Sequence, residues 1–135
     1  MTDLVYDDLV GTPYARGAAG PQEFDCYGLV KECANRTGIY VPDHQQLASY
    51  AAIAALIDEK RPLWEEVPEQ PNTVALIRIK HLIDGKVVTL NSHVGWVLPH
   101  GRMIHAWEQS GGVVVEKLDP VWTRRIVGFY RFPQP

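Results

Sequence analysis

The sequence predicts an α+β fold in which helices come first and an antiparallel sheet follows. Apolar residues recur at helical spacing in two segments between about residues 25 and 60, whereas from Val74 onward they alternate at a period of two. Helices and strands that are segregated along a chain favour α+β over an alternating α/β fold. The 135 residues contain no internal repeat and no low-complexity linker, so we expect one domain spanning residues 1–135.

Two helices are expected in the first half of the chain. The first runs from about residue 25 to 37, because Gly38 provides a C-terminal stop and the Gly/Pro-rich stretch 11–21 before it cannot be helical. The second runs from about residue 44 to 60 and ends at Pro62. Both carry apolar residues at helical spacing, so each should bury one face.

The second half contains short segments that read as strands joined by tight turns. Asp84-Gly85 is a hairpin signal, and Pro99-His100-Gly101 is another. The expected strands span residues 74–80, 86–90, 92–98, 102–107, 112–118 and 125–132.

Composition excludes several classes of function. The net charge is −3 and no Lys/Arg cluster is present, so nucleic acid is a poor partner. No apolar run is long enough to span a membrane, and the N-terminus lacks the pattern of a signal peptide. We therefore expect a chain made in the cytoplasm. No cluster suggests a metal, and no cofactor is expected.

Cys26 is the candidate nucleophile, because it lies where a loop turns into a helix. Backbone N–H groups and the helix dipole stabilise a thiolate there and are expected to bring the pKa from about 8.5 to between about 3.5 and 7.5. Cys33 lies on the same predicted helix, at a Cα distance of roughly 10 Å. A disulfide needs less than about 7 Å, so both thiols should be free, and Cys33 should be core.

The base for Cys26 is sought among five histidines. If the second hairpin closes so that Val97 faces Gly101, His93 faces His105 on one side of the sheet. Gly95 between them would then leave an opening beside His93 for a helix end or a substrate. Solvated positions are expected for the other three histidines, with His44 at a helix start, His81 at a strand end and His100 in the turn.

A cysteine, a histidine and a third polar group form the general arrangement of thiol acyl-transfer enzymes. Cys26 would attack a carbonyl carbon, His93 would take its proton, and His105 would hold His93 in the useful tautomer. The Cys26 backbone N–H and the Tyr14 hydroxyl are candidate donors to the oxyanion. Trp107 should share the face of His105 and could line a substrate groove, while Trp96 should be core.

Four sequence blocks together resemble the NlpC/P60 family of cysteine peptidases, which are bacterial cell-wall hydrolases. They are residues 11–14 (Gly-Thr-Pro-Tyr), 24–30 (Phe-Asp-Cys-Tyr-Gly-Leu-Val), 93–96 (His-Val-Gly-Trp) and 103–106 (Met-Ile-His-Ala). The tyrosine stands twelve residues before the cysteine, and the histidines are twelve apart. The resemblance spans nearly the whole chain.

The resemblance implies a papain-like fold with the nucleophile helix packed on the sheet. It implies cleavage of peptidoglycan stem peptides, typically between D-γ-glutamyl and a diamino acid, without metal or organic cofactor. Cys26, His93, His105 and Tyr14 match the nucleophile, the base, the orienting residue and the tyrosine beside the oxyanion. Asp25 matches an acidic residue that faces the substrate amine in some members. For Asp25 taken by itself, capping of the helix is the favoured role, and the two roles are compatible.

The chain departs from the family pattern at several positions. Tyr27 stands where the family usually has Ser, so the substrate subsite should differ there. Residues 80–92 look like an added hairpin near His93, and the Pro-Gly-Asp that usually precedes the sheet appears as Pro71-Asn72-Thr73. The Cys-Tyr-Gly sequence and the ending 122–131 are closer to the branch found in phage tails, which predicts a virion-associated enzyme with tail-tip partners.

Two alternatives remain open from the sequence. A structural tail-tip subunit could keep the fold and lose useful activity, and reactivity of the thiol with iodoacetamide near pH 6 would separate it from an enzyme. A cytoplasmic peptidase recycling muropeptides would need a closed pocket at Asp25.

Overall fold

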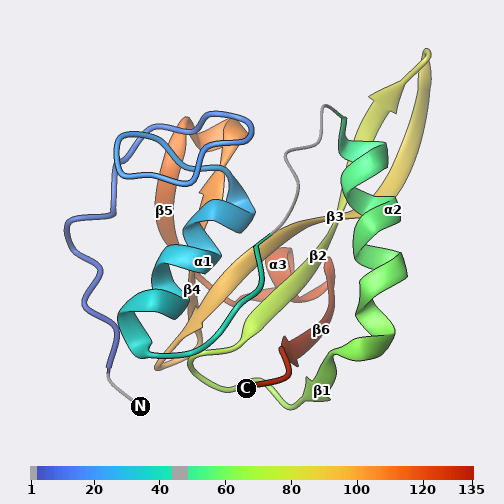
Figure 1. The fold of residues 1–135 in the computed structure, drawn as a ribbon. Coiled ribbons are helices and arrows are strands. Elements are labelled where there is room, and N and C mark those ends of the chain that lie inside the picture. The colour runs from blue at the N-terminus through green and yellow to red at the C-terminus, as the bar shows by residue number, and fades with distance from the viewer. Residues whose placement is uncertain (1–2, 44–48) are drawn as a thin grey trace.

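The computed structural model describes residues 3–43 and 49–135 and confirms the α+β prediction. Six strands form one antiparallel sheet in the order β1-β6-β2-β3-β4-β5, with α1 and α2 in front of it and α3 behind (Figure 1). The elements are α1 (Cys26–Thr37), α2 (Tyr50–Lys60), η1 (Arg61–Leu63), β1 (Glu65–Val67), β2 (Val74–Ile83), β3 (Lys86–Leu98), β4 (Arg102–Trp107), η2 (Glu108–Ser110), β5 (Gly112–Lys117), α3 (Pro120–Thr123) and β6 (Ile126–Arg131).

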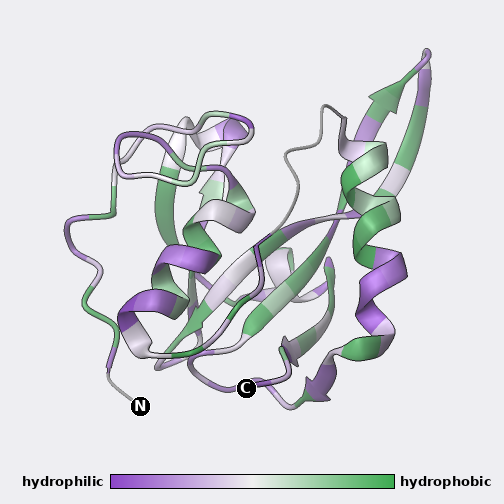
Figure 2. Cartoon of the chain, in the orientation of Figure 1, coloured by the Kyte–Doolittle hydropathy of each residue, from purple (hydrophilic) through white to green (hydrophobic). Residues whose placement is uncertain are grey.

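Helix α1 begins and ends where local chemistry requires. The Asp25 side chain accepts a hydrogen bond from the Gly28 backbone N–H (2.6 Å), which satisfies one of the unpaired donors at the helix start. Gly38 takes a left-handed conformation (φ 76°) and closes the C-terminus. The helix buries one face against β3 and β4, and its outer face is polar (Figure 2). The buried residues of that face include Leu29, Val30, Cys33 and Ala34.

Strand β3 is a single strand where the sequence predicted two. Ile77 pairs with His93 and Arg78 pairs with Asn91, so Ser92 is an extra residue on β3. The interruption is thus a β-bulge inside a continuous strand, not a break between two strands. Bulges bend a strand and re-aim the neighbouring side chain, and this one immediately precedes His93.

The register between β3 and β4 differs by two residues from the predicted one. Val97 pairs with Met103, not with Gly101. Because the shift is even, His93 and His105 still share one face. The expected opening at Gly95 was wrong: a Cβ there would lie 3.0 Å from the Met103 sulfur and 3.4 Å from the His105 Cβ. Gly95 therefore makes room for core side chains.

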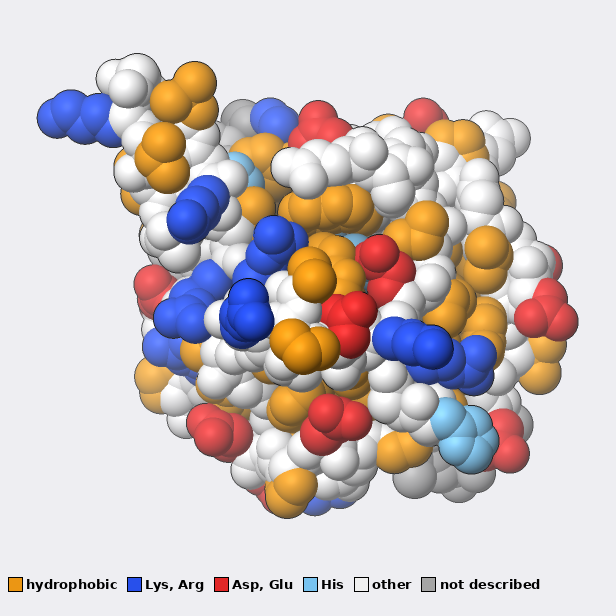
Figure 3. All heavy atoms as spheres, turned by 180° about the vertical axis from the view of Figure 1, so that it is seen from behind, with side chains coloured by type: hydrophobic (Ala, Val, Ile, Leu, Met, Phe, Trp, Pro, Cys, Tyr) orange, Lys and Arg blue, Asp and Glu red, His pale blue; other side chains and the backbone are white. Residues whose placement is uncertain are grey.

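Apolar clusters cover both faces of the sheet. The larger lies between α1 and the strands and contains Trp96 and Cys33, which confirms both as core residues. The smaller lies on the opposite face, where Trp122 of α3 covers Val97 and Met103. Seen from behind, that face carries interspersed acidic and basic side chains, and the tip of the β2–β3 hairpin projects beyond it (Figure 3).

Helix α2 is much less buried than α1. Ser49 caps it, and Ala54 is its one buried residue. The predicted first residues of this helix, including His44, lie outside the described part of the chain. The short β1 and α3 were not predicted. No helix among residues 3–43 and 49–135 has the length and apolar character needed to cross a membrane.

Candidate active site

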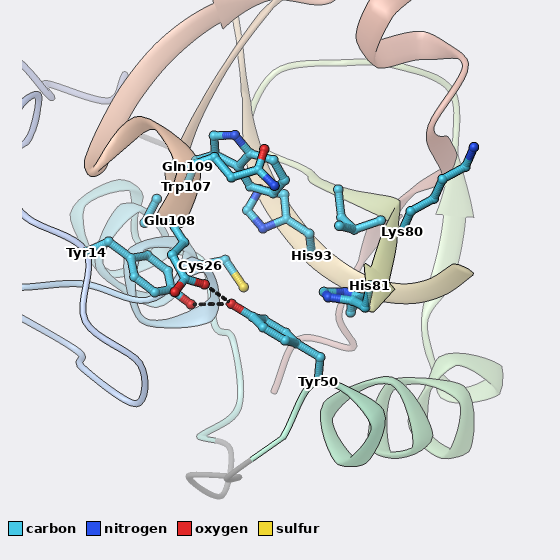
Figure 4. A pocket seen from close by; sticks show the side chains of 12 residues that line it. Tyr14, Cys26, Tyr50, Lys80, His81, His93, Trp107, Glu108 and Gln109 are labelled. Atoms are coloured by element: carbon cyan, nitrogen blue, oxygen red, sulfur yellow. Dashed lines mark hydrogen bonds between the residues drawn. The ribbon is translucent and has the colours of Figure 1, made fainter. Parts of the chain in front are cut away.

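Cys26 is the first residue of α1 and lies at the junction of two cavities. The smaller has a volume of about 80 Å³, enough for a few water molecules, and its lining includes Cys26, His93 and Trp107 (Figure 4). The larger is a groove of about 720 Å³ that runs from Cys26 between α1 and α2. The structure therefore brings the predicted nucleophile and base to one cavity and gives the sulfur a second, wider approach.

The two predicted histidines form a hydrogen-bonded pair. His93 Nε2 lies 2.7 Å from His105 Nδ1, and the rings are 5.0 Å apart in an edge-to-face arrangement. Side-chain burial leaves His93 5% and His105 0% exposed. Burial lowers the pKa of both imidazoles, well below the usual value at His93. Both rings are therefore neutral at neutral pH.

The other edge of His93 is available for chemistry. Its Nδ1 hydrogen-bonds no described residue, and the described residues hold no fully buried side-chain nitrogen or oxygen without a partner. Nδ1 must then be reached from the small cavity that Cys26 also lines. Trp107 closes one side of that cavity, with its ring 4.8 Å from the His93 ring.

The expectation of a low Cys26 pKa was wrong for the substrate-free protein. Burial, and next the Asp25 carboxylate, raise the pKa of the thiol to about 12, although the backbone N–H groups of Val94, Tyr27 and Cys26 act to lower it. Desolvation disfavours the thiolate more than the helix start stabilises it, and the neutral His93 provides no positive charge. The resting pair is a thiol beside a neutral imidazole.

Tyr14 lies across the site from His93 within a chain of hydroxyl groups. Its hydroxyl is 3.4 Å from the Tyr50 hydroxyl, which donates to the Glu108 carboxylate (Figure 4). Burial chiefly raises the pKa of Tyr14, and the hydrogen bond to Tyr50 raises it further. The phenol therefore keeps its proton. Because Tyr50 donates its own proton to Glu108, Tyr14 donates to the Tyr50 oxygen in the substrate-free site, and an oxyanion would have to replace that long hydrogen bond.

Asp25 and Tyr27 line the groove and not the small cavity. Both carboxylate oxygens of Asp25 accept backbone N–H groups, one from Gly28 at 2.6 Å and the other from Gly17 at 3.1 Å. The Tyr27 hydroxyl donates to the Pro42 carbonyl, and its ring meets Phe132 edge to face. Asp25 thus caps the helix, and the unusual Tyr27 forms part of the groove wall.

Several residues of the site were missed from the sequence. Tyr50, the first residue of α2, lines the site. Its ring stacks on the His81 ring with a centroid distance of 4.3 Å, and the Arg16 guanidinium carbon lies 4.7 Å from the Tyr50 ring centroid. His81, expected to be solvated, lines the small cavity and hydrogen-bonds Ser92 at 2.7 Å. Tyr50 and His81 are brought to the site by packing between α2 and the sheet, and no local sequence motif predicts this packing.

Glu116 is the missed residue with the clearest signal. Its carboxylate oxygen lies 2.6 Å from His105 Nε2, on the side away from His93. It is the one acidic residue in β5, and alternation puts it on the same face as Val114, which pairs with His105. Apart from its last residue, β5 is otherwise apolar. A charged residue on the face that also carries Val114 could therefore have been singled out from the sequence.

The predicted absence of a metal stays a prediction. Among residues 3–43 and 49–135, no group of three or more His, Cys, Asp or Glu side chains is arranged to hold a metal ion. The polar groups of the site instead fit acid–base chemistry at a thiol.

Known proteins similar to this chain share the fold and the sequence blocks. The NlpC/P60 family profile matches residues 11–131. Proteins named probable endopeptidase from Mycobacterium tuberculosis and Mycobacterium bovis are each 27% identical over 122 residues, covering 86% of this chain and 26% of theirs. The chain therefore spans about a quarter of the length of the curated relatives it matches.

Solved structures give the same fold at low sequence identity. An NLP/P60-family protein of Staphylococcus aureus, described as similar to lipoprotein, superposes with a TM-score of 0.63 at 21% identity, over 96% of this chain and 39% of that one. NlpC1 of Trichomonas vaginalis superposes with a TM-score of 0.63 at 20% identity, over 92% and 40%. Because the profile matches residues 11–131, which is nearly the whole chain, the chain belongs to the NlpC/P60 family.

Proposed function

We propose that this chain is a cysteine peptidase that cleaves peptide bonds in bacterial cell-wall stem peptides. The observation that carries the proposal is the pairing of His93 with His105 at 2.7 Å in the cavity that Cys26 also lines. Membership of the NlpC/P60 family supports it, as do the endopeptidase names of relatives.

The neutral resting state defines the first chemical step. As the Cys26 sulfur attacks the scissile carbonyl, its proton passes to His93 Nδ1, so the thiolate forms only during the attack. The charged tetrahedral adduct then collapses when His93 gives that proton to the leaving amine. Water, deprotonated by the same imidazole, hydrolyses the remaining thioester and regenerates the thiol.

The tetrahedral oxyanion would be held from two sides. One donor would be the backbone N–H of Cys26, because it lies at the positive end of α1, where negative charge is stabilised. The Tyr14 hydroxyl stands across the cavity and keeps its proton because burial raises its pKa. Asp25 as a partner of a substrate amine stays a prediction. Its oxygens already accept backbone N–H groups, one from Gly28 in α1 and one from Gly17 in the preceding loop.

The groove would receive the stem peptide. It combines apolar surface from α2 with charged groups at Arg16, Asp43 and Lys60. A substrate with carboxylates, an amine and short apolar side chains matches such a lining. The bond between D-γ-glutamyl and the diamino acid is our specific proposal for the cleavage site.

The setting in a phage tail also stays a proposal from the sequence. It rests on the Cys26-Tyr27-Gly28 stretch and on the ending at residues 122–131. Co-purification of the chain with tail-tip proteins from virions would support it.

Digestion of purified peptidoglycan tests the enzyme proposal. The wild-type chain should release peptides ending at the predicted bond, read by mass spectrometry, and Cys26→Ala should release none. Cys33→Ala is the matched control, because it removes the other, fully buried thiol and leaves the site intact. Equal release by wild type and Cys26→Ala would overturn the nucleophile assignment. No release by either from walls of several stem chemistries would favour the structural tail subunit.

A further inference from the structure

Among the described residues, Glu116 is hydrogen-bonded to the candidate active site through His105. It belongs to β5, lines neither cavity and keeps its side chain 38% exposed, yet its oxygen lies 2.6 Å from the fully buried Nε2 of His105. We propose that Glu116 is a positioning residue that fixes the tautomers of both imidazoles and so leaves the Nδ1 lone pair of His93 directed at the Cys26 thiol.

The argument follows the donors and acceptors outward from the carboxylate. An ionised carboxylate only accepts hydrogen bonds, so His105 must carry its proton on Nε2. A neutral imidazole has one N–H, which leaves His105 Nδ1 as an acceptor. At 2.7 Å from that acceptor, His93 Nε2 must be the donor. His93 Nδ1 is then unprotonated, which is the form that accepts a thiol proton.

The reverse order of donors would disable the site. If His105 carried a proton on Nδ1, it would donate to His93 Nε2, and the only N–H of His93 would then lie on Nδ1. His93 Nδ1 would then carry a proton on the side of the thiol and could not act as a base. Two changes permit this reverse order. A doubly protonated His105 carries a proton on Nδ1 as well, and without the Glu116 acceptor the single proton of His105 is no longer held on Nε2.

Two features of the structure hold the working order in place. Burial of His105 lowers its pKa and so disfavours the doubly protonated ring, although Glu116 opposes that effect. The rings themselves cannot easily turn, since Trp122 packs edge to face on His105 at 4.9 Å and Trp107 lies 4.8 Å from His93. With the rings fixed, the proton positions depend on the acceptor at the end of the chain.

The geometry of the sheet explains why β5 provides this residue. Val114 pairs with His105 and Glu116 pairs with Met103, so Glu116 is the diagonal neighbour of His105 on the same face. Diagonal neighbours lie about 7–8 Å apart at the backbone, which a glutamate side chain can bridge. A shorter Asp at this position should fall short of the same atom.

Direct observation of the tautomers tests the inference without any substrate. Long-range ¹H–¹⁵N correlation spectra of the full chain at pH 7 should show both His93 and His105 protonated on Nε2 only. Glu116→Met removes the acceptor while keeping a similar length, and should produce a mixture of tautomers at both rings. An Nδ1–H on either ring of the wild type, or unchanged tautomers in Glu116→Met, would overturn the proposal.

Kinetics provides the second readout, which rests on the proposed peptidase activity. Glu116→Met should lower kcat by about 10- to 100-fold with little change in KM, in line with the larger losses known when a triad histidine takes the wrong tautomer. Glu116→Gln keeps an acceptor oxygen and should retain more activity. Glu65→Gln is the control, because it removes an exposed carboxylate from β1 at the opposite edge of the sheet.

The two readouts separate the possible failures. A wild-type chain with both rings protonated on Nε2 but no activity on any stem peptide would sink the proposed function and leave the tautomer inference standing. An active Glu116→Met variant with kcat within twofold of wild type would overturn the positioning role. Thermal unfolding of each variant shows whether a loss of kcat reflects a loss of fold.

Discussion

The two sides of Cys26 are built in opposite ways. On one side, which we call the sheet wall, His93, His105 and Glu116 lie on strands of a packed sheet, with both rings buried. On the other, which we call the helix wall, Tyr50 comes from α2, a helix with one buried residue, and links to Tyr14 and Glu108 through partly exposed hydroxyl and carboxylate groups.

The difference teaches how this fold divides its tasks. Proton transfer needs fixed distances, and the sheet wall obtains them from a continuous sheet and an aromatic cover. Admission of a substrate needs a surface that can yield, and α2, whose one buried residue is Ala54, can provide it. Substitutions in the sheet wall should therefore act on kcat, and those in the helix wall on KM.

The largest effect is expected at the base. His93→Asn removes the proton acceptor and should lower kcat by about 10²- to 10⁴-fold. His100→Asn is the matched control, because His100 is an exposed turn residue with φ 66°, a conformation that Asn tolerates. Peptide release measured under saturating substrate checks both. Equal losses in the two variants would mean that a general loss of fold, not the base, is being measured.

The thiol should show its raised pKa in its reactivity. With the pKa near 12, the thiolate fraction grows about tenfold per pH unit, so alkylation of Cys26 by iodoacetamide should rise about 10³-fold between pH 6 and pH 9. The rate is followed by mass spectrometry, with Cys26→Ala confirming the site. A plateau already reached at pH 6 would show a preformed thiolate and contradict the neutral resting pair.

The helix wall should respond more mildly. Tyr50→Ala removes the stack on His81 and the contact with Arg16 and should raise KM about tenfold, with kcat changed less. Tyr50→Phe keeps the ring and loses only the hydroxyl link, so we expect a change within about threefold. A Tyr50→Ala variant that loses kcat at unchanged KM would place Tyr50 with the sheet wall.

The smallest effect is expected on stability against pH. The folded pKa of His93 and of His105 lies below 6.5, so the unfolded chain binds protons that the folded one does not as pH falls below that value. Stability is therefore present above pH 6.5 and is lost below it, by up to about 1.4 kcal/mol per pH unit for each histidine. Urea unfolding at pH 7.5, 6.5 and 5.5 measures the slope, which should be shallower in His93→Asn.

The sequence was a good guide wherever the cause of a structure is local. Asp25 and Gly38 bound α1 as predicted, because a cap and a left-handed glycine act on their nearest neighbours. The shared face of His93 and His105 was also right, although the register was off by two, since alternation depends only on parity.

Long-range packing accounts for what the sequence did not reveal. The bulge at Ser92 depends on how β2 pairs with β3, and the pocket role of His81 depends on α2 laying Tyr50 over it. The thiol pKa was predicted in the wrong direction, because the helix start is a local feature whereas desolvation comes from the whole surrounding fold.

The sequence by itself determined the family, the α+β order and which cysteine and histidines the candidate site contains. Only the tertiary structure decided that the resting thiol is neutral, that a groove opens beside α2 and that Glu116 ends the chain of imidazoles. The physical reason is that motif spacing along one segment fixes which groups are present, whereas the charge and tautomer of each group depend on neighbours brought from distant strands.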